Sequence, residues 1–385
     1  MQVSTVVSRE TVRGRRQCPA ATLKPAAGVR SAALLLGLSL LGLLLLSACR
    51  GIASPQGWAA PVAVDNTLLV TLARGTLSAF DQQTSQQTWQ FPSKDAKNID
   101  LKAIYGTPVT GDSRVYVGAF DGTFYALDLA TGQVVWQQKT GGAIVGGAAL
   151  VDGTVYVGSS DNKLYAFDAA SGASRWTPFE AQGDIWSTPV VDQGTVYVTS
   201  MDHRVYALDA ATGQPKWPAP FQAEGAIPST PALAGDRLYV GALDNRLYAL
   251  DKATGKVAWS FKADNWVWCD PLVASGVVYF GGLDHHVYAL DAATGEPRWG
   301  KPFAAKVPIR AQPAIAGGTL VVVDQDGDVY GLDPATGEER WPSIVLGSGV
   351  LASPLVMNNE VLMSTRDWKL LRVDAQAGSF SQVAP

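Results

Sequence analysis

Aromatic and charged side chains recur along the chain at one fixed position, three residues before a segment that usually opens with proline. Trp58, Trp186 and Trp268 occupy this position, and so do Tyr105 and Arg310. The remaining copies carry Val145, Pro228 and Leu351 there. Large aromatic and Arg side chains that gather on a surface typically mark a recognition site. We therefore predict a binding face with the candidate residues Trp58, Tyr105, Trp186, Trp266, Trp268, Arg310, Trp368, Asp184 and Asp270.

Trp266 and Trp368 belong to this set because they fall in loops at the same end of their repeats. Asp264 and Lys306 lie close to the set in sequence and could contribute charge. A second interpretation stays open, in which the same tryptophans fill the channel of a ring-shaped fold as ordinary core. Both interpretations place the aromatic side chains around the mouth of that channel.

The acidic and histidine residues give no comparable indication of catalysis. One acidic position starts a turn in seven copies: Asp121, Asp161, Asp202, Asp244, Asp284, Asp326 and Asp367. The next residue is often Gly or Asn, so turn formation explains these carboxylates. His203, His285 and His286 fall in turns two copies apart, and residues 324–328 hold only a fragment of a calcium loop. We predict no catalytic residue and no metal site.

All these positions belong to a repeat that occurs eight times. Its central Asp recurs every 40 to 47 residues, as Asp81, Asp128, Asp168, Asp209, Asp251, Asp291, Asp333 and Asp374. A Trp ends seven copies, as Trp89, Trp136, Trp176, Trp217, Trp259, Trp299 and Trp341, and Gln382 stands at that spacing in the eighth. A period near 41 with turn residues at fixed offsets indicates a propeller or another repeat array. We expect the repeated Trp to dock one copy on the next rather than to bind a ligand.

Each copy contains four short strand signals separated by turn signals. In the second copy they cover residues 107–110, 114–118, 123–128 and 133–136, and β-branched and aromatic residues alternate within them. Units of this kind expose both sheet faces and must therefore stack. We predict an all-β fold, an eight-bladed β-propeller of four-stranded antiparallel blades over residues 58–385. The first strand of each blade should be innermost, which places the loops before it on one face of the ring.

The repeat resembles a known family once its phrase is written out as Ala-x-Asp-x-x-Thr-Gly-x-x-x-Trp. Residues 126–136, 207–217, 249–259 and 289–299 match this phrase in full, while Ser171, Gly331 and Ser85 are departures in other copies. The phrase is that of the tryptophan-docking repeats in PQQ-like (quinoprotein-type) β-propellers. The resemblance covers residues 58–385 and implies the same eight-bladed fold.

The front of the chain is of a different kind. Residues 1–48 combine a basic head with an apolar, uncharged run, as an export signal does. The run ends Leu46-Ser-Ala-Cys49, which resembles the lipobox of bacterial lipoproteins and implies lipid modification of Cys49. We therefore predict a signal peptide over 1–48, a lipidated tether over 49–57 and an exported protein anchored in the cell envelope. A signal anchor with a coincidental Cys49 is the alternative.

Charge and cysteine content narrow the classes of partner. Without residues 1–48 the chain has 24 Lys and Arg against 33 Asp and Glu, a formal charge of −9. Nucleic-acid binders usually carry a basic footprint, so we expect no nucleic-acid partner. Membrane attachment should then depend on lipid at Cys49 rather than on a basic surface. Cys269 is the remaining cysteine of the ring, and we expect a monomer without disulfides.

Three functions remain open on the sequence. A lipid-anchored ring with no added domain is similar in layout to the family of the outer-membrane assembly factor BamB. That likeness implies a non-enzymatic scaffold for partner proteins, with no cofactor. A small-ligand or glycan sensor is the first alternative, and a dehydrogenase that uses PQQ and calcium is the second. The resemblance to such dehydrogenases also implies an adjacent pair of cysteines beside the quinone, and Cys269 has no such neighbour.

Overall fold

The computed structural model describes residues 57–72, 75–96 and 99–384. The predicted signal peptide over 1–48, Cys49 and residues 50–56 of the tether lie outside them. Within the described ranges the secondary structure is β-strand throughout, and none of it is a helix that could cross a membrane.

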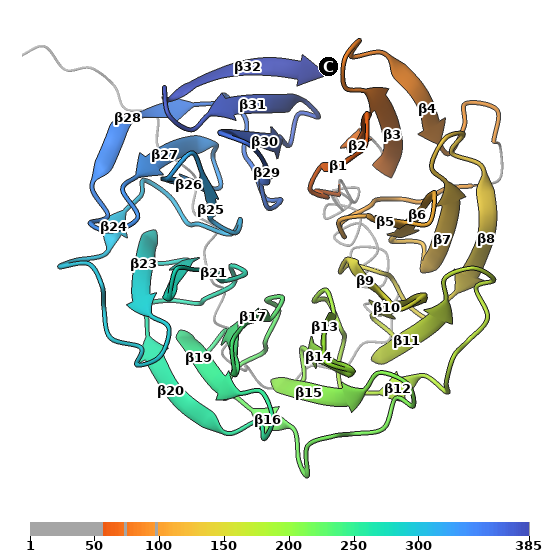
Figure 1. Ribbon diagram of the computed structural model, residues 1–385, viewed down its shortest axis with the longest axis horizontal. Helices are drawn as coiled ribbons and strands as arrows, with labels where there is room; N and C mark the ends of the chain where they lie inside the picture. Colours follow the sequence, from red (N-terminus) through yellow and green to blue (C-terminus); the bar gives the residue numbers. More distant parts are fainter. Residues whose placement is uncertain (1–56, 73–74, 97–98, 385) are drawn as a thin grey trace, which may run out of the picture. The chain divides into compact units, whose positions relative to one another are not determined.

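The strands form eight antiparallel sheets of four, arranged as the blades of a ring (Figure 1). Every sheet is built from four consecutive strands, and the first strand of each lies against the central channel. The predicted eight-bladed propeller is therefore confirmed, including the innermost position of each first strand. The loops that lead into these first strands consequently meet around the channel.

The strands of the first four blades follow the repeat closely. Blade 1 has β1 (Val62–Val64), β2 (Thr67–Leu72), β3 (Thr76–Asp81) and β4 (Gln87–Phe91). Blade 2 has β5 (Val109–Gly111), β6 (Arg114–Gly118), β7 (Thr123–Asp128) and β8 (Val134–Lys139). Blade 3 has β9 (Ala148–Val151), β10 (Thr154–Gly158), β11 (Lys163–Asp168) and β12 (Phe179–Glu180). Blade 4 has β13 (Val190–Asp192), β14 (Thr195–Thr199), β15 (Arg204–Asp209) and β16 (Phe221–Gln222).

The last four blades have the same order of strands. Blade 5 has β17 (Ala232–Ala234), β18 (Arg237–Gly241), β19 (Arg246–Asp251) and β20 (Val257–Lys262). Blade 6 has β21 (Leu272–Ala274), β22 (Val277–Gly281), β23 (His286–Asp291) and β24 (Phe303–Ala304). Blade 7 has β25 (Ala314–Ala316), β26 (Thr319–Val323), β27 (Asp328–Leu332) and β28 (Glu339–Val345). Blade 8 has β29 (Leu355–Met357), β30 (Glu360–Ser364), β31 (Leu370–Asp374) and β32 (Ser379–Ala384).

The repeated phrase makes a tight turn between the third and fourth strands, as blade 5 illustrates. The Asp251 carboxylate accepts hydrogen bonds from the backbone N–H of Thr254 at 2.9 Å and from its hydroxyl at 2.7 Å. These bonds, the hydroxyl foremost, lower the pKa of Asp251 because they favour the charged carboxylate. Gly255 follows with a φ of 72°, a conformation that glycine adopts without strain.

Glycine is required at position 255 for a second reason, which is the neighbouring blade. A Cβ atom there would lie 2.6 Å from the indole ring of Trp217 in blade 4. The ring of each repeated Trp thus packs on the turn glycine of the next blade. Its Nε1 donates to a backbone carbonyl there, in the pairs Trp89–Leu129, Trp136–Ala169, Trp176–Ala210, Trp217–Lys252, Trp259–Ala292, Trp299–Pro334 and Trp341–Ala375.

Blade 8 meets blade 1 without such a tryptophan. In blades 5 and 7 the docking Trp on the fourth strand pairs with Ala249 or Gly331, two residues before the repeated Asp. In blade 8 the residue at that third-strand position is Arg372, and it pairs with Ser381 rather than with Gln382. The predicted position, Gln382, is wrong by one residue. In blade 5 a bulge adds one residue to the fourth strand before Trp259, whereas β32 pairs from Ser379 to Ser381 without such a bulge. On the other side of the junction, Ser85 replaces the turn glycine with a φ of 57°. Glycine's small size is not needed there because no indole packs on the turn.

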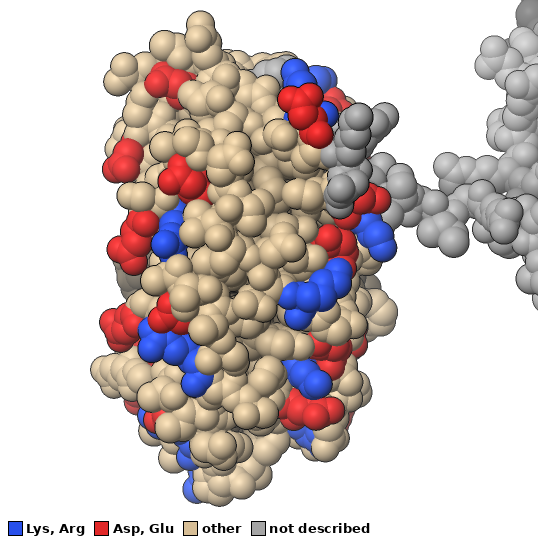
Figure 2. Space-filling model, turned by 90° about the vertical axis from the view of Figure 1, so that its right-hand side faces the viewer, with Lys and Arg blue, Asp and Glu red and all other residues tan. Residues whose placement is uncertain are grey.

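Charged side chains of both signs alternate on the side of the ring shown in Figure 2, with no basic patch on that face.

Candidate functional site

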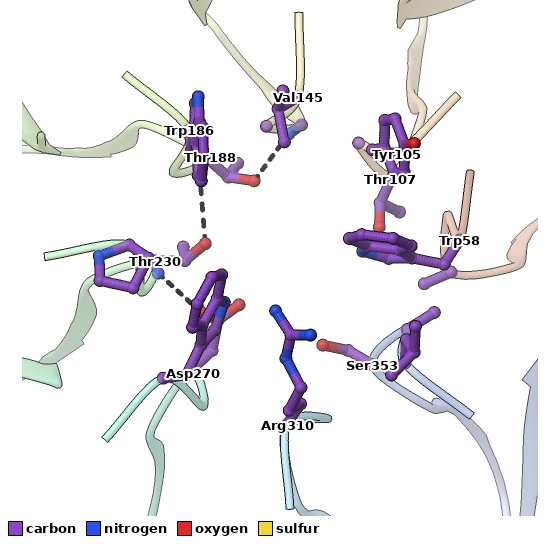
Figure 3. A pocket seen from close by; sticks show the side chains of 18 of the residues that line it. Trp58, Tyr105, Thr107, Val145, Trp186, Thr188, Thr230, Asp270, Arg310 and Ser353 are labelled. Carbon is purple, nitrogen blue, oxygen red and sulfur yellow. Dashed lines mark hydrogen bonds between the residues drawn. The ribbon is translucent and has the colours of Figure 1, made fainter. Parts of the chain in front are cut away.

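A cavity of about 410 Å³ opens at the channel mouth, where the loops before the first strands converge (Figure 3). The residue at the repeated position of every blade lines it: Trp58, Tyr105, Val145, Trp186, Pro228, Trp268, Arg310 and Leu351. The sequence therefore predicted the walls of the cavity from position in the repeat alone. The binding role of these walls stays a prediction.

Trp58 and Tyr105 form one wall, contributed by blades 1 and 2. Their rings meet edge to face with centroids 4.4 Å apart, and Tyr105 packs in turn on Phe120 at 5.4 Å. Trp58 remains 37% exposed. An indole that is supported on one side and open on the other offers an apolar contact surface at little entropic cost.

Trp186 forms the opposite wall and is fixed by its polar edge. Its Nε1 donates to the Ser160 hydroxyl at 3.0 Å and to an Asp184 carboxylate oxygen at 3.1 Å. Asp184 therefore orients Trp186 instead of lining the cavity. The indole presents its apolar atoms to the cavity because its only donor is already bonded.

Trp268 and Arg310 form a cation–π pair at the third side. The guanidinium carbon of Arg310 lies 4.1 Å from the centroid of the Trp268 ring. Stacking of this kind holds the long Arg side chain in one orientation. The Arg310 side chain is half-buried, and burial lowers its pKa because it disfavours the charged form.

An arc of polar residues, which we call the polar belt, also lines the cavity: Thr188, Thr230 and Asp270, each directly before a first-strand proline. Gly147 N–H donates to Thr188 Oγ1 at 3.0 Å, and Thr188 N–H donates to Thr230 Oγ1 at 3.3 Å. Thr230 N–H donates to Asp270 Oδ1 at 2.6 Å. The belt thus links blades 3 to 6 around the channel. Sequence reasoning missed it, although comparing the residue before each proline would have revealed it.

Asp270 is the acidic member of the polar belt. Burial raises its pKa to about 6, against the opposing effect of the hydrogen bonds from Thr230. The side chain lines the cavity and is half-buried, so it is close enough to act on anything bound there. Asp270 thus lies in the cavity, and its role in binding stays a prediction.

Cys269 lies behind the cavity wall. It is fully buried, and its Sγ lies 3.1 Å from the carbonyl oxygen of Asp270 and 3.2 Å from that of Ala311. Burial raises the pKa of the thiol, which keeps it neutral and unreactive. Cys269 is therefore part of the wall's internal packing.

Four other candidates do not line the cavity. Trp266 is 44% exposed on the loop leading to Trp268, and Trp368 is half-buried in the β30–β31 turn with a φ of 69°. Lys306 pairs with Asp328 at 3.1 Å, and Asp264 is exposed. The repeat places all four at the same end of the ring, but none of their side chains lines the cavity.

The repeated acidic position has a structural role. In blade 6, Asp284 accepts hydrogen bonds from the N–H of His286 at 3.0 Å and from the Tyr288 hydroxyl at 2.7 Å. His285, which lies between Asp284 and His286, has a φ of 70°, as the turn requires. Across the described residues, no three His, Cys, Asp or Glu side chains come together in a way that could hold a metal ion.

The cavity combines apolar surface with charged groups. Its walls are apolar and rigid, and two ionisable groups, Arg310 and Asp270, project from different blades (Figure 3). Sites with apolar walls and a few placed polar groups are typical of ligand or side-chain recognition.

Comparisons with known proteins agree with this fold. BamB from Moraxella catarrhalis has 21% identity and a TM-score of 0.70, over 82% of this chain and 95% of that chain. The computationally designed protein Ika8 has 20% identity and a TM-score of 0.71 over the same shares. Quinohemoprotein alcohol dehydrogenase from Comamonas testosteroni has 18% identity and a TM-score of 0.67, over 83% of this chain and 70% of that chain. At these identities the likeness concerns the fold alone.

At the level of sequence, no curated protein matches the chain. The family model described as outer membrane protein assembly factor BamB does match, over residues 52–178, 120–226, 203–343 and 284–381. These overlapping matches span the ring from blade 1 to blade 8. The chain therefore belongs to the BamB family of PQQ-like β-propellers.

Proposed function

We propose that the protein is a non-enzymatic, lipid-anchored scaffold of the cell envelope, whose channel mouth holds a partner protein. The observation that carries this proposal is the convergence of Trp58, Trp186, Trp268, Tyr105 and Arg310 on one open cavity. Trp, Tyr and Arg are the residues that most often dominate binding energy in protein interfaces. Membership of the BamB family supports a partner in outer-membrane protein assembly, if the organism has two membranes.

The anchor in this proposal is a lipid on Cys49. The protein would face the periplasm from the outer membrane in a cell with two membranes, and would sit on the outer face of the cytoplasmic membrane in a cell with one. Replacing the thiol in Cys49→Ser is expected to release the protein from the membrane fraction. Retention of the variant in that fraction would favour the signal-anchor alternative.

Photo-crosslinking in cells tests the partner at the channel mouth. A photoreactive amino acid is placed at Trp58 on the rim and, as a control, at exposed Glu339 on the outer strand β28. We expect a discrete protein adduct from position 58 and none from position 339. The double variant Trp186→Ala/Trp268→Ala should lose that adduct while it keeps the melting behaviour of a folded ring. Equal adducts from both positions would contradict the proposal.

A small-ligand or glycan sensor remains the second candidate because the cavity, at about 410 Å³, is large enough for a small molecule. Mass spectrometry of the protein under native conditions, purified directly from cells, separates the two functions. A bound small molecule at full occupancy would favour the sensor, and a bare chain together with a discrete crosslinked protein would favour the scaffold.

The residues do not fit the quinone site that a PQQ-dependent dehydrogenase implies. That resemblance calls for an adjacent cysteine pair beside the cofactor, whereas Cys269 is alone, fully buried and bonded to backbone carbonyls behind the wall. We therefore assign no reaction step through PQQ or calcium.

A further inference from the structure

Arg310 is a cation without a counterion in the described part of the chain. None of the ion pairs found there involves Arg310, and no protein oxygen among the described residues accepts a hydrogen bond from its guanidinium. Its carboxylate neighbour in the cavity, Asp270, is bonded instead to Thr230 N–H. A half-buried guanidinium loses hydration that the protein itself does not replace.

The position of Arg310 determines what could replace that hydration. Stacking on Trp268 directs the fork of N–H donors into the cavity (Figure 3). A planar fork of this kind matches a carboxylate, which it can bind through two parallel hydrogen bonds. A cationic ligand would meet repulsion at this point, and a neutral sugar would leave the charge unpaired. The cavity therefore favours an anionic group of carboxylate geometry.

The surroundings of Arg310 favour a carboxylate on an apolar carrier that is larger than the cavity. Trp58 and Trp186 line the cavity on the two sides of the space that the Arg310 guanidinium faces, so the atoms next to the carboxylate would lie between indole rings (Figure 3). Outside the cavity, Trp266 is 44% exposed on the loop that leads to Trp268 and offers a further apolar contact. A surface that extends past the cavity suits a protein loop better than a small molecule.

We propose that the channel mouth binds an acidic side chain, Asp or Glu, carried on an apolar loop of the partner protein, and that Arg310 pairs with its carboxylate. This inference rests on the proposed function and names the chemistry of the partner. Asp270 lies in the same cavity and opposes the incoming negative charge, so it limits the affinity for the loop. The two residues thus make opposite contributions that can be separated by mutation.

Capped peptides with the sequence Gly-Leu-Asp-Leu-Gly and Gly-Leu-Asn-Leu-Gly test the preference, with 4-methylpentanoate as a free small carboxylate. Binding to the full chain in detergent is followed by tryptophan fluorescence, since the probes contain no aromatic residue. We expect the Asp peptide to bind at least about tenfold more tightly than the Asn peptide. Arg310→Gln should reduce this ratio to about one, while the control Arg340→Gln, at the outer edge, should keep it. Asp270→Asn should tighten binding of the Asp peptide.

The outcomes distinguish this inference from the proposed function. Three results would overturn the inference of an acidic loop: equal binding of the two peptides, no binding of either, or an affinity ratio that is unchanged in Arg310→Gln. Binding of 4-methylpentanoate as tight as that of the Asp peptide would assign the site to a small molecule. If crosslinking from position 58 persists in any of these cases, the proposed scaffold function would still stand. The partner would then be held by apolar contacts alone. Melting curves of each variant confirm that the ring is folded.

Discussion

At position 270 the polar belt carries a carboxylate where the neighbouring blades carry Thr188 and Thr230. Each of these side chains accepts a hydrogen bond from the blade before it, so any acceptor of the right length would serve the fold. A threonine would do so without burying a charge. The carboxylate therefore costs stability that the hydrogen bonds of the belt do not require.

The first prediction concerns this cost. Asp270→Asn keeps an oxygen acceptor for Thr230 N–H and removes the charge. Because burial raises the pKa of Asp270 from 3.8 to about 6, the folded protein binds the proton more tightly than the unfolded chain does. The contribution of Asp270 to stability is thus lost in the wild type as pH rises from about 4 to about 6, and the variant lacks this change. Above pH 6 we expect the variant to be more stable by at most about 3 kcal/mol, measured by thermal or denaturant unfolding at several pH values.

The pH profile contains its own control. Below about pH 4 Asp270 is protonated in both states, so the variant and the wild type should unfold alike. An advantage of equal size at pH 3.5 and pH 8 would show that the substitution acts through packing rather than charge. The value of about 3 kcal/mol is an upper limit because the cavity is open to solvent, which screens the carboxylate.

On the scale of the strands and turns, one repeated sequence motif, Ala-x-Asp-x-x-Thr-Gly-x-x-x-Trp, holds neighbouring blades together. The Trp that ends a copy packs on the turn glycine of the next copy, and its Nε1 caps a carbonyl of the same turn. The Asp and Thr of that turn hold it in the conformation that accepts the indole. Each member of the phrase therefore stabilises a contact between two blades rather than the interior of one.

The second prediction compares two tryptophans with opposite surroundings. Trp217→Ala removes a buried ring and leaves the carbonyl of Lys252 without its donor, so we expect a loss of roughly 3–5 kcal/mol in unfolding free energy. Trp266→Ala removes an exposed ring, and the expected change is within about 0.5 kcal/mol. Denaturant unfolding of both variants measures the difference. Similar losses from the two would mean that docking on Gly255 contributes little.

For the whole molecule, the repeat made the ring and the walls of its cavity predictable. Departures from a repeat stand out in sequence, so Trp58, Trp186 and Trp268 could be assigned to one mouth before any coordinates. Sequence did not predict side-chain direction, because that depends on contacts between blades. Trp266 is exposed outside the cavity, and Asp184 orients Trp186 instead of lining the cavity. Sequence spacing also placed Gln382 where the structure has Ser381. A missing bulge changes which residues pair across the two strands, and the number of residues in the copy does not reveal it.

The junction of blades 8 and 1 differs from the other seven junctions of the ring. It lacks a docking tryptophan, and its hydrophobic cluster, built on Leu68, Val70, Phe80, Leu362 and Leu370, is the smallest of the eight clusters formed by described residues. Nor can the polar belt cross it through blade 1, because Ala60 occupies the belt position there and has no side-chain acceptor. No strand is shared between the two blades, since each sheet is built from consecutive strands. Among the described residues, side-chain packing is therefore what closes the ring at this junction.

The last prediction follows from this closure. Hydrogen exchange followed by mass spectrometry should show faster exchange in β2 and β30, beside the junction, than in β14 and β18. All four are buried second strands of their blades, so burial within a blade would predict equal rates. Opening at the junction instead exposes blades 1 and 8 first, because the free energy of local opening is lowest where packing is thinnest. Equal protection of the four strands would mean that the ring opens only by unfolding as a whole.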